Sequence, residues 1–272
     1  MVDIKADYAI IGGTGVYDPR FFVDAIDCTI ETPYGNATAT IGTYGGKRVA
    51  FLARHGTGHQ VPPHLVNYRA NIYALHTIGV QTLCATAAVG SLRPDLTPGS
   101  LLLADDFLDF TKSRPATFTG PGAVTHADMT DPYCPGVRAR ISKAAAELGH
   151  SIHPHGTYVC TEGPRFETAA EIRFYSGLGA SVVGMTSVPE VVLARELGMC
   201  YATICIVTNF AAGISGAPLT HKEVVDTMSE NINSIRDILA KWIDEDTIGD
   251  NACHCRDHIV HDVSLHDAAS SS

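Results

Sequence analysis

Two short stretches of the chain carry side chains that could hold a flat heterocycle next to an anion. Residues 161–168 read TEGPRFET, and residues 184–190 read GMTSVPE. Between them they supply an aromatic ring, a carboxylate, a thioether and a hydroxyl, from Phe166, Glu167, Met185 and Thr186. Aromatic rings stack on flat ligands, and carboxylates and hydroxyls form hydrogen bonds with them. We therefore interpret the two stretches as parts of one ligand site.

Each of these side chains also has an ordinary structural explanation. Phe166 and Met185 could simply fill the core, as such residues usually do. Glu167 could be no more than a favourable charge near the start of a helix. The functional interpretation therefore depends on the other segments that accompany them.

Further segments carry groups suited to an oxyanion. The turn Gly12–Gly15 follows an apolar run, so that its backbone N–H groups can converge on an anion while the Thr14 hydroxyl donates directly. Arg54 and His55 supply a forked donor and a second donor at the end of another apolar run. The small residues 85–90, ATAAVG, allow close backbone approach. Thr186 precedes a predicted helix, whose positive end its hydroxyl can join. A tight turn and a surface pair are the structural alternatives.

The same glycine turn could belong to a nucleotide-binding dehydrogenase. That fingerprint requires G-x-G-x-x-G, and counting from Gly13 the last position holds Asp18. No clear strand–helix–strand unit with a ribose-binding acid about 20 residues further on accompanies it. The dehydrogenase interpretation is therefore disfavoured.

The elements that must position these residues alternate between strands and helices. Apolar runs predict strands over residues 6–11, 47–53, 82–85, 157–160, 181–183 and 200–207. Helical spacing predicts helices over residues 66–78 and 135–148. Three more helices are expected after a Ser or Thr followed three residues later by Glu, at Thr168/Glu171, Ser187/Glu190 and Thr220/Glu223. This order predicts an α/β fold with a twisted, mostly parallel sheet flanked by helices, which binds ligands at the carboxyl ends of its strands.

Size and charge limit the function classes. The chain has 272 residues, which fits a single domain over residues 1–243 followed by a polar Cys- and His-containing tail over residues 244–272. The net charge of -10 without a basic cluster argues against nucleic acid as a partner but not against a small anion. No apolar run approaches the roughly 18 residues of a membrane span, and the charged N-terminus does not resemble a signal peptide. We expect a cytoplasmic protein.

Eight cysteines require a separate interpretation. Cys84, Cys160, Cys200 and Cys205 lie in apolar runs and are most simply small buried residues, whereas Cys134 lies in a loop. Cys253 and Cys255 lie in the polar tail and are followed by further histidines. A metal site, a strained Cys-x-Cys disulfide and a mobile tail with free thiols are all compatible with this pattern, and we assign no metal ligand from the sequence.

Taken in order from about Tyr8 to about Ile238, these segments, together with ARH at residues 53–55 and VTN at residues 207–209, resemble the trimeric purine nucleoside phosphorylase and methylthioadenosine phosphorylase family. The resemblance implies a nucleoside phosphorylase-like fold, a homotrimer, and a pentosyltransferase of purine salvage that needs no cofactor besides phosphate as co-substrate. Some thermophilic relatives have Cys-x-Cys tails like this one. The matching phosphate-binding positions are Thr14, Arg54, His55, the backbone at Ala87 and Ala88, and Thr186.

The resemblance also assigns the base and sugar positions. Phe166 matches a residue that faces the purine, and Met185 one that packs under ribose and base. Glu167 matches an acceptor for N1–H of a 6-oxopurine. Relatives that act on 6-aminopurines carry Asp at the positions of Asn209 and Ala211, and this chain departs from them at both. An amide can donate to N7 or O6 without an unusual pKa, so we expect inosine or guanosine rather than adenosine.

The 5′ end of the sugar is open between two interpretations. His221 matches a histidine that contacts the 5′-hydroxyl in inosine and guanosine enzymes. His126 matches a residue of the methylthio branch that reaches across from a neighbouring subunit. We favour His221, because an imidazole gains little beside a methylthio group.

The expected reaction is reversible phosphorolysis of a 6-oxopurine nucleoside to free base and ribose 1-phosphate. Asn209, Glu167 and His55 are the residues expected to carry it, with His55 holding phosphate rather than acting as a base. Methylthioinosine or methylthioadenosine is the alternative substrate. A non-catalytic purine-binding or metal-binding protein is the alternative from a different class.

Overall fold

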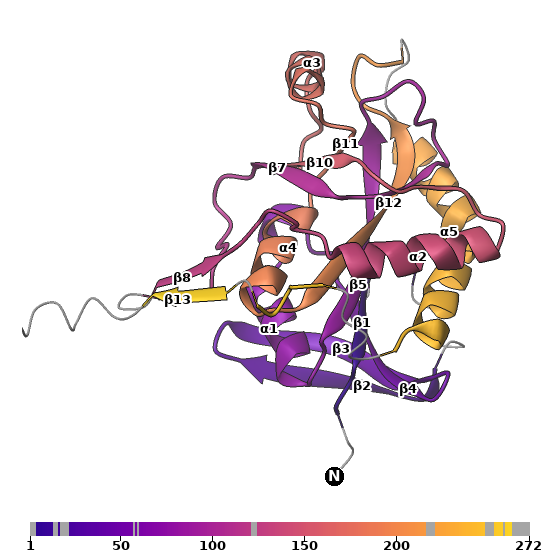
Figure 1. Cartoon of the computed structure of the whole chain (residues 1–272). Helices are drawn as coiled ribbons and strands as arrows, with labels where there is room; N and C mark the ends of the chain where they lie inside the picture. Colours follow the sequence, from indigo (N-terminus) through magenta and orange to yellow (C-terminus); the bar gives the residue numbers. More distant parts are fainter. Residues whose placement is uncertain are drawn as a thin grey trace, which may run out of the picture.

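The computed structural model of the protein describes residues 4–12, 16, 22–56, 58, 60–120, 124–215, 221–247, 253–257 and 259–262 (Figure 1). For residues 124, 221–226, 228–230 and 259–262 it describes the backbone only. None of the helices in these ranges combines the length and apolar character needed to span a bilayer.

Most of the described strands form one mixed sheet. Its main order is β2-β3-β4-β1-β5-β11-β10-β7, with β12 pairing with β5 and β6, and β9 pairing with β6. The strands are β1 (Tyr8–Gly12), β2 (Val23–Thr32), β3 (Gly35–Tyr44), β4 (Lys47–Ala53), β5 (Thr82–Ser91), β6 (Leu101–Leu103), β7 (Asp106–Phe110), β9 (Ile152–His153), β10 (Thr157–Thr161), β11 (Val182–Gly184) and β12 (Cys200–Phe210). The central pairs β4–β1, β1–β5 and β5–β12 are parallel. The predicted α/β fold with a mostly parallel sheet is confirmed.

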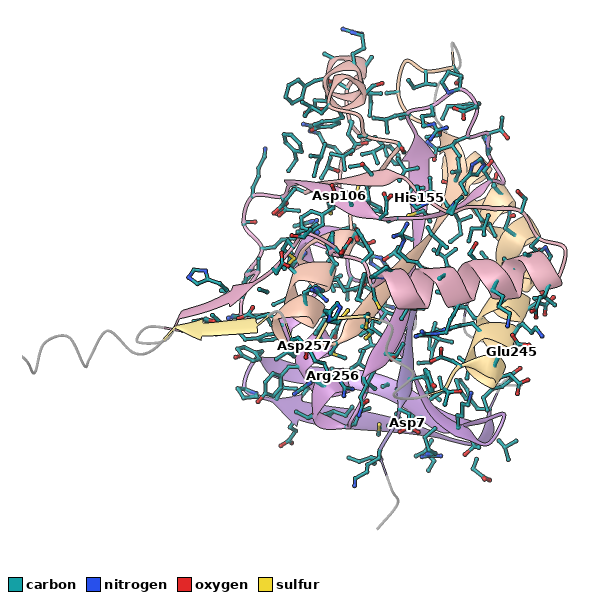
Figure 2. The ribbon with its side chains drawn as sticks, in the orientation of Figure 1. Asp7, Asp106, His155, Glu245, Arg256 and Asp257 are labelled. Carbon is teal, nitrogen blue, oxygen red and sulfur yellow. The ribbon has the colours of Figure 1, made fainter. Side chains whose placement is uncertain are left out.

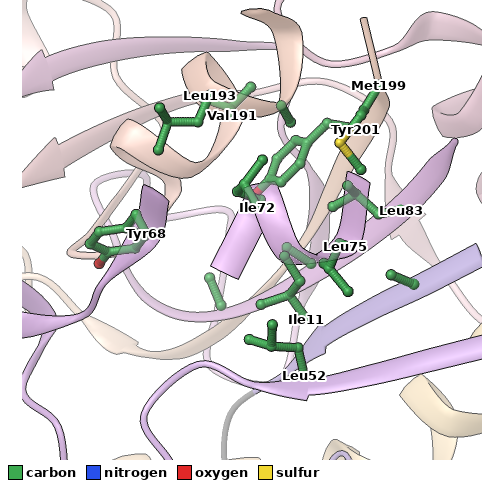
Figure 3. Close-up of a cluster of buried hydrophobic side chains, with 14 of the residues drawn as sticks. Ile11, Leu52, Tyr68, Ile72, Leu75, Leu83, Val191, Leu193, Met199 and Tyr201 are labelled. Carbon is green, nitrogen blue, oxygen red and sulfur yellow. The ribbon is translucent and has the colours of Figure 1, made fainter. Parts of the chain in front are cut away.

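Two pairs of helices cover the two faces of the sheet (Figure 1). The helices are α1 (Tyr68–Thr77), α2 (Pro135–Glu147), α3 (Ala169–Gly177), α4 (Ser187–Glu196), α5 (His221–Glu245) and the short 3-10 helix η2 (Pro63–Leu65). α2 and α5 pack together on one face, and α5 ends at Glu245 (Figure 2). α1 and α4 pack on the other face, where Ile72 and Leu193 meet Leu83 of β5 in the core (Figure 3).

The predicted helix starts have different outcomes. Thr168 and Glu171 form the expected capping box at the start of α3. At α4 the expected box is wrong: Val188 is extended (φ -109, ψ 131), and the Glu190 side chain turns into the core instead of back to the cap. The third expected cap, Thr220, lies outside the described residues, although α5 does begin at His221.

Strands β2 and β3, which the sequence analysis did not predict, form an antiparallel hairpin at one edge of the sheet. A second hairpin-like ribbon is made by β8 (Val124–Ala127) and β13 (Ile259–Asp262), which pair antiparallel although they lie far apart in the sequence. This ribbon extends away from the body of the protein (Figure 1). Part of the C-terminal segment is therefore ordered: Cys255 is buried, and β13 completes the ribbon.

Candidate active site

The middle of β5 is open along one edge. β1 pairs with this edge at residues 82–85, and β11 pairs with it in the opposite direction at Gly90 and Ser91. Among the described residues, no strand pairs with residues 86–89 on this edge, whereas β12 pairs along the other edge. Ala88 is exposed between buried neighbours on both sides. A change of neighbouring strand near the carboxyl ends of parallel strands is where α/β sheets bind ligands.

Arg54 lies directly after β4, and its side chain reaches the open edge of β5. Its side chain is buried, with 4% of the residue exposed. Nε and Nη2 each donate to a carboxylate oxygen of Glu190 at 2.8 Å, and Nη1 donates to the Thr86 carbonyl at 2.9 Å. Burial alone would lower the pKa of Arg54, but the Glu190 carboxylate outweighs it and raises that pKa above its ordinary value. The sequence analysis expected the guanidinium group to face an anion, but Nε and Nη2 are both bound to Glu190. Nη1 is the donor that lies nearest the open edge of β5.

Glu190 is the main site-forming residue that the sequence analysis misassigned. It is fully buried and, besides Arg54, accepts a hydrogen bond at 2.8 Å from the Tyr201 hydroxyl. Tyr201 in turn accepts from Thr203 at 3.1 Å. Pairing fixes the direction of the guanidinium, since a bidentate ion pair allows only one planar geometry. A local signal for this arrangement existed, because the residue before a proline avoids the helical conformation and Val188 precedes Pro189.

His55 is buried beside Arg54, and its tautomer follows from its partner. Nδ1 lies 2.8 Å from the Val61 carbonyl oxygen, which can only accept, so Nδ1 carries the hydrogen and donates. In the neutral ring Nε2 is then an acceptor, and only the imidazolium donates from both nitrogens. The sequence-based expectation of a simple second donor therefore holds for the charged ring, whereas the neutral ring would instead accept from a protonated phosphate.

Thr186 lies where the sequence analysis expected it, immediately before α4. It is buried, and its hydroxyl does not cap the helix. Its backbone N–H donates to the Tyr158 hydroxyl at 3.4 Å. The hydroxyl can therefore serve a ligand at the positive end of α4. Thr14 lies outside the described residues, whereas Gly12 at the end of β1 pairs with Ala53 at the end of β4.

The predicted base-binding residues gather on the loop after β10 and the end of β11. Thr161 donates to Glu167 at 2.6 Å, and burial raises the pKa of Glu167 above its ordinary value. Phe166 is 50% exposed, which leaves its ring available to a ligand or to a second chain. Gly163 has a φ of +65°, and a Cβ there would lie 2.5 Å from Sδ of Met185. Met185 therefore packs directly on the turn that carries Phe166 and Glu167.

A buried arginine that the sequence analysis did not single out holds these segments together. Arg114 donates to the carbonyls of Met185 and Val188 at 2.7 Å, and to the carbonyl of Glu162 at 2.7 Å. Its side chain is only 2% exposed and forms an ion pair with the Glu162 carboxylate at 3.4 Å. The β10 loop, the end of β11 and the start of α4 are thereby fixed to one guanidinium. No local pattern indicates this role, since every partner comes from a distant segment.

Asn209 lies at a bulge of β12, where the register with β5 shifts between Val207 and Asn209. Its Oδ1 accepts from the Thr208 hydroxyl at 2.8 Å, and its Nδ2 donates to the Phe210 carbonyl at 2.9 Å. Because a carbonyl can only accept, the NH2 group must face Phe210. The second N–H of Nδ2 donates no hydrogen bond within the described part of the chain. A Cβ on Gly90 would lie 3.1 Å from this nitrogen, so the amide lies directly over β5.

The chain beyond Asn209 returns to the base-binding loop. The N–H of Ala211 donates to the Ser91 carbonyl at 2.8 Å, and Ala211 is buried in a small apolar cluster with Val183 and Ile172. A Cβ on Gly213 would lie 2.9 Å from the Ala169 Cβ at the start of α3. The residues after β12 and those around Glu167 are therefore neighbours.

The two halves of the site meet on β5. Arg54 contacts Thr86, and Asn209 lies over Gly90, four residues further along the strand. At about 3.3 Å per residue the two contacts lie about 13 Å apart along the strand. A separation of this size accommodates an anion and a bicyclic base with a sugar between them. Ala87 is buried and Ala88 is exposed within this interval.

The two histidines proposed for the 5′ end of the sugar differ in what can be described. His221 is the first residue of α5, and only its backbone lies within the described part. His126 is exposed on β8, opposite Val260 of β13. β8 lies on the far side of α4 from β5 (Figure 1), so a single chain does not bring His126 to the other predicted residues.

Known proteins share this sequence and this fold. The family model described as Phosphorylase superfamily matches residues 7–244. The 6-oxopurine nucleoside phosphorylase of Pyrococcus furiosus is 55% identical over 235 residues, covering 84% of this chain and 88% of that protein. The S-methyl-5′-thioadenosine phosphorylase of Hyperthermus butylicus is 50% identical over 243 residues, covering 88% of each. A crystal structure of a methylthioadenosine phosphorylase from an antarctic soil metagenomic library has a TM-score of 0.89 at 35% identity, covering 96% of this chain and 94% of that one. The chain belongs to the phosphorylase superfamily.

Proposed function

We propose that the protein catalyses the reversible phosphorolysis of 6-oxopurine nucleosides, as a pentosyltransferase of purine salvage. The observation that carries this proposal is the Asn209 amide, which keeps one N–H for a ligand, together with the Glu167 carboxylate on the neighbouring loop. A 6-oxopurine presents acceptors at N7 and O6 and a donor at N1, which match an amide N–H and a carboxylate. Adenine keeps the acceptor at N7 but carries a donor at N6 in place of O6 and an acceptor at N1, so a contact of the amide with the 6-position and the contact of the carboxylate with N1 would both become repulsive.

In the proposed reaction, a phosphate oxygen forms a bond to C1′ as the bond between C1′ and N9 breaks. The electron pair of the broken bond passes to the purine, and positive charge develops at C1′. Phosphate beneath C1′ is both nucleophile and electrostatic stabiliser, while Asn209 donates to N7 or O6 of the leaving base. No side-chain nucleophile takes part. Inorganic phosphate is a co-substrate, and the proposal includes no other cofactor.

The phosphate in this proposal binds at the open edge of β5. Arg54 Nη1, the Thr186 hydroxyl, His55 and the backbone at Ala87 and Ala88 are the described groups that would hold it. The family resemblance adds Thr14 to these phosphate-binding groups.

A second substrate class is favoured by one observation. His126 projects on the ribbon of β8 and β13, as expected for a residue that reaches a neighbouring subunit in methylthio-specific enzymes. We include methylthioinosine and methylthioadenosine as alternative substrates for this reason, and we propose a homotrimer in which the ribbon contacts the next chain. Light scattering measures the mass of the assembly directly.

The deciding experiment incubates the protein with inosine, guanosine, adenosine, methylthioinosine and methylthioadenosine, with and without phosphate, and follows base release. We expect phosphate-dependent release from inosine and guanosine. Asn209→Asp should lower the inosine-to-adenosine ratio of kcat/KM by about tenfold or more, since about 1–3 kcal/mol is lost when a ligand acceptor loses its donor. An unchanged ratio would contradict the role of Asn209. Base binding without turnover would favour a non-catalytic binder, and a fluorescence response to NADH would favour a dehydrogenase.

A further inference from the structure

Four cysteines from three distant parts of the chain come together away from the candidate active site. The sulfur atoms of Cys134, Cys200, Cys253 and Cys255 all lie within 4.8 Å of one another. All four are free thiols, and the separation of Cys200 from Cys253 is 3.4 Å. Four thiolates around zinc, each at about 2.3 Å from the metal, place the sulfur atoms about 3.8 Å apart at the corners of a tetrahedron. The cluster therefore has the size of a tetrathiolate metal site.

Two of the four cysteines lie at the ends of regular elements, and three of the four are buried. Cys134 caps α2 at its N-terminus, and its backbone N–H donates to the Tyr201 carbonyl of β12 at 2.8 Å. Cys200 is the first residue of β12. Cys134, Cys200 and Cys255 are buried, and Cys253 is half-buried. Figure 2 labels Arg256 and Asp257, the two residues that follow Cys255 in the chain. A shielded set of four ligands is typical of structural zinc rather than catalytic zinc.

The surroundings of the cluster suit a negatively charged group. Four thiolates and one divalent cation carry a net charge of about -2. The N-terminus of α2, beside Cys134, presents the positive end of the helix dipole. Arg195 is buried, its guanidinium lies within electrostatic range of Cys255, and its Nε has no hydrogen-bond partner within the described residues. A buried cation beside four thiols is more easily explained when those thiols are thiolates bound to a metal.

We propose that Cys134, Cys200, Cys253 and Cys255 bind one zinc ion. Binding exchanges four thiol protons for one divalent cation, with no change in oxidation state. Four sulfur ligands in a tetrahedron favour zinc over the harder cations magnesium and calcium, which prefer oxygen. This inference concerns residues that the proposed phosphorolysis does not use, and it replaces the interpretation of the sequence in which no metal ligand was assigned.

The site would attach the C-terminal segment to the body of the protein. Cys253 and Cys255 come directly before β13, which pairs with β8. Zinc therefore fixes the start of the strand that holds the projecting ribbon and, through the pairing of Val260 with His126, the position of His126. Metal binding free energy becomes folding free energy when the unbound segment cannot hold its place alone.

Metal analysis of the full-length protein, purified under a reductant that does not bind metal, tests the proposal. We expect about one zinc per chain. Reconstitution with cobalt should give the intense visible bands of tetrahedral cobalt with thiolate-to-metal charge transfer, because cobalt occupies zinc sites with the same geometry. Cys255→Ser should lower the affinity for zinc by about tenfold or more. It should also increase hydrogen exchange in residues 259–262.

Cys28→Ser is the matched control. Cys28 lies on β2, is half-buried, and donates to the Ala39 carbonyl at 3.4 Å, outside the cluster. This variant should keep wild-type metal content and cobalt spectra. Mass spectrometry of protein purified and alkylated without any reductant detects the two opposing outcomes. Metal-free protein in which all four thiols react, or protein that has lost four hydrogens to two disulfides among these cysteines, would overturn the zinc site.

Discussion

Replacing Glu190 with Gln should show how strongly the buried ion pair with Arg54 supports both the fold and the phosphate site. In the native protein the Glu190 carboxylate accepts from Nε and Nη2 of Arg54 and from the Tyr201 hydroxyl, each at 2.8 Å. Gln keeps the shape but has one accepting oxygen instead of two. Its NH2 group would then face a guanidinium N–H or a hydroxyl, and the charge of Arg54 would stay buried without its counter-ion.

The magnitude follows from burial. The side chains of Arg54 and Glu190 are 2% and 0% exposed, so that water cannot replace the lost partner. Removing one member of a buried pair typically costs about 3–5 kcal/mol. For a domain of roughly this size, with about 2–4 °C per kcal/mol, the expected fall in Tm is roughly 6–20 °C.

Thermal unfolding at one fixed protein concentration, without phosphate, measures the loss of stability. KM for phosphate measures the effect on the proposed phosphate site. We expect a higher phosphate KM because Arg54 Nη1 is held towards Thr86 only while Glu190 fixes the guanidinium plane. Glu171→Gln is the matched control: Glu171 pairs with the exposed Arg165, and such pairs contribute about 0–1 kcal/mol. Equal falls in Tm for the two variants would refute the argument from burial. A large fall in Tm with an unchanged phosphate KM would refute the role of the pair at the site.

Two further predictions concern the base-binding loop. Gly163→Ala should raise KM for the nucleoside and destabilise the protein by about 1–2 kcal/mol, because a non-glycine residue is strained at φ +65° and its Cβ would displace Met185. Gly177→Ala is the control: nothing lies within 4 Å of a Cβ there, so this variant should neither raise KM nor destabilise the protein. Glu167 accepts N1–H more strongly when ionised, so kcat/KM for inosine should fall as the pH drops through a pKa raised above the ordinary 4.5. A pH profile in which Glu167→Gln keeps the same acidic limb would remove Glu167 from that role.

Local patterns in the sequence were sufficient for the parallel core of the fold. Strand β4 matches its predicted bounds because an apolar run defines it, and α2 ends within one residue of its prediction because helical spacing and the following Gly149 define it. The hairpin of β2 and β3 was missed because most of β2 is exposed and its residues do not form an apolar run. The start of α4 was misread because a Ser and Glu at cap spacing outweighed the proline between them.

The site divides in the same way. The sequence was enough to propose Arg54, Thr186, Glu167 and Asn209 as site residues, because local patterns place them near strand ends or helix starts and the family resemblance implies a role for each. Arg114 and the cysteine cluster could not, because their partners lie in distant segments and only the folded sheet brings them together. One unaligned sequence carries no signal for such pairs.

The open stretch of β5 gives a structural reason for proposing that the named residues form one site rather than several. Arg54 is bound to Thr86 and to the buried Glu190, while Asn209 lies over Gly90 on the same strand. Neither end can move along the strand without breaking contacts in the core. In the proposed reaction, the distance between the anion and the base is therefore set by the pleat of β5 and not by a flexible loop. Under the same proposal, selectivity among purine nucleosides arises from the donors and acceptors that face the base and from what contacts the 5′ position, and much less from adjustment of the sugar.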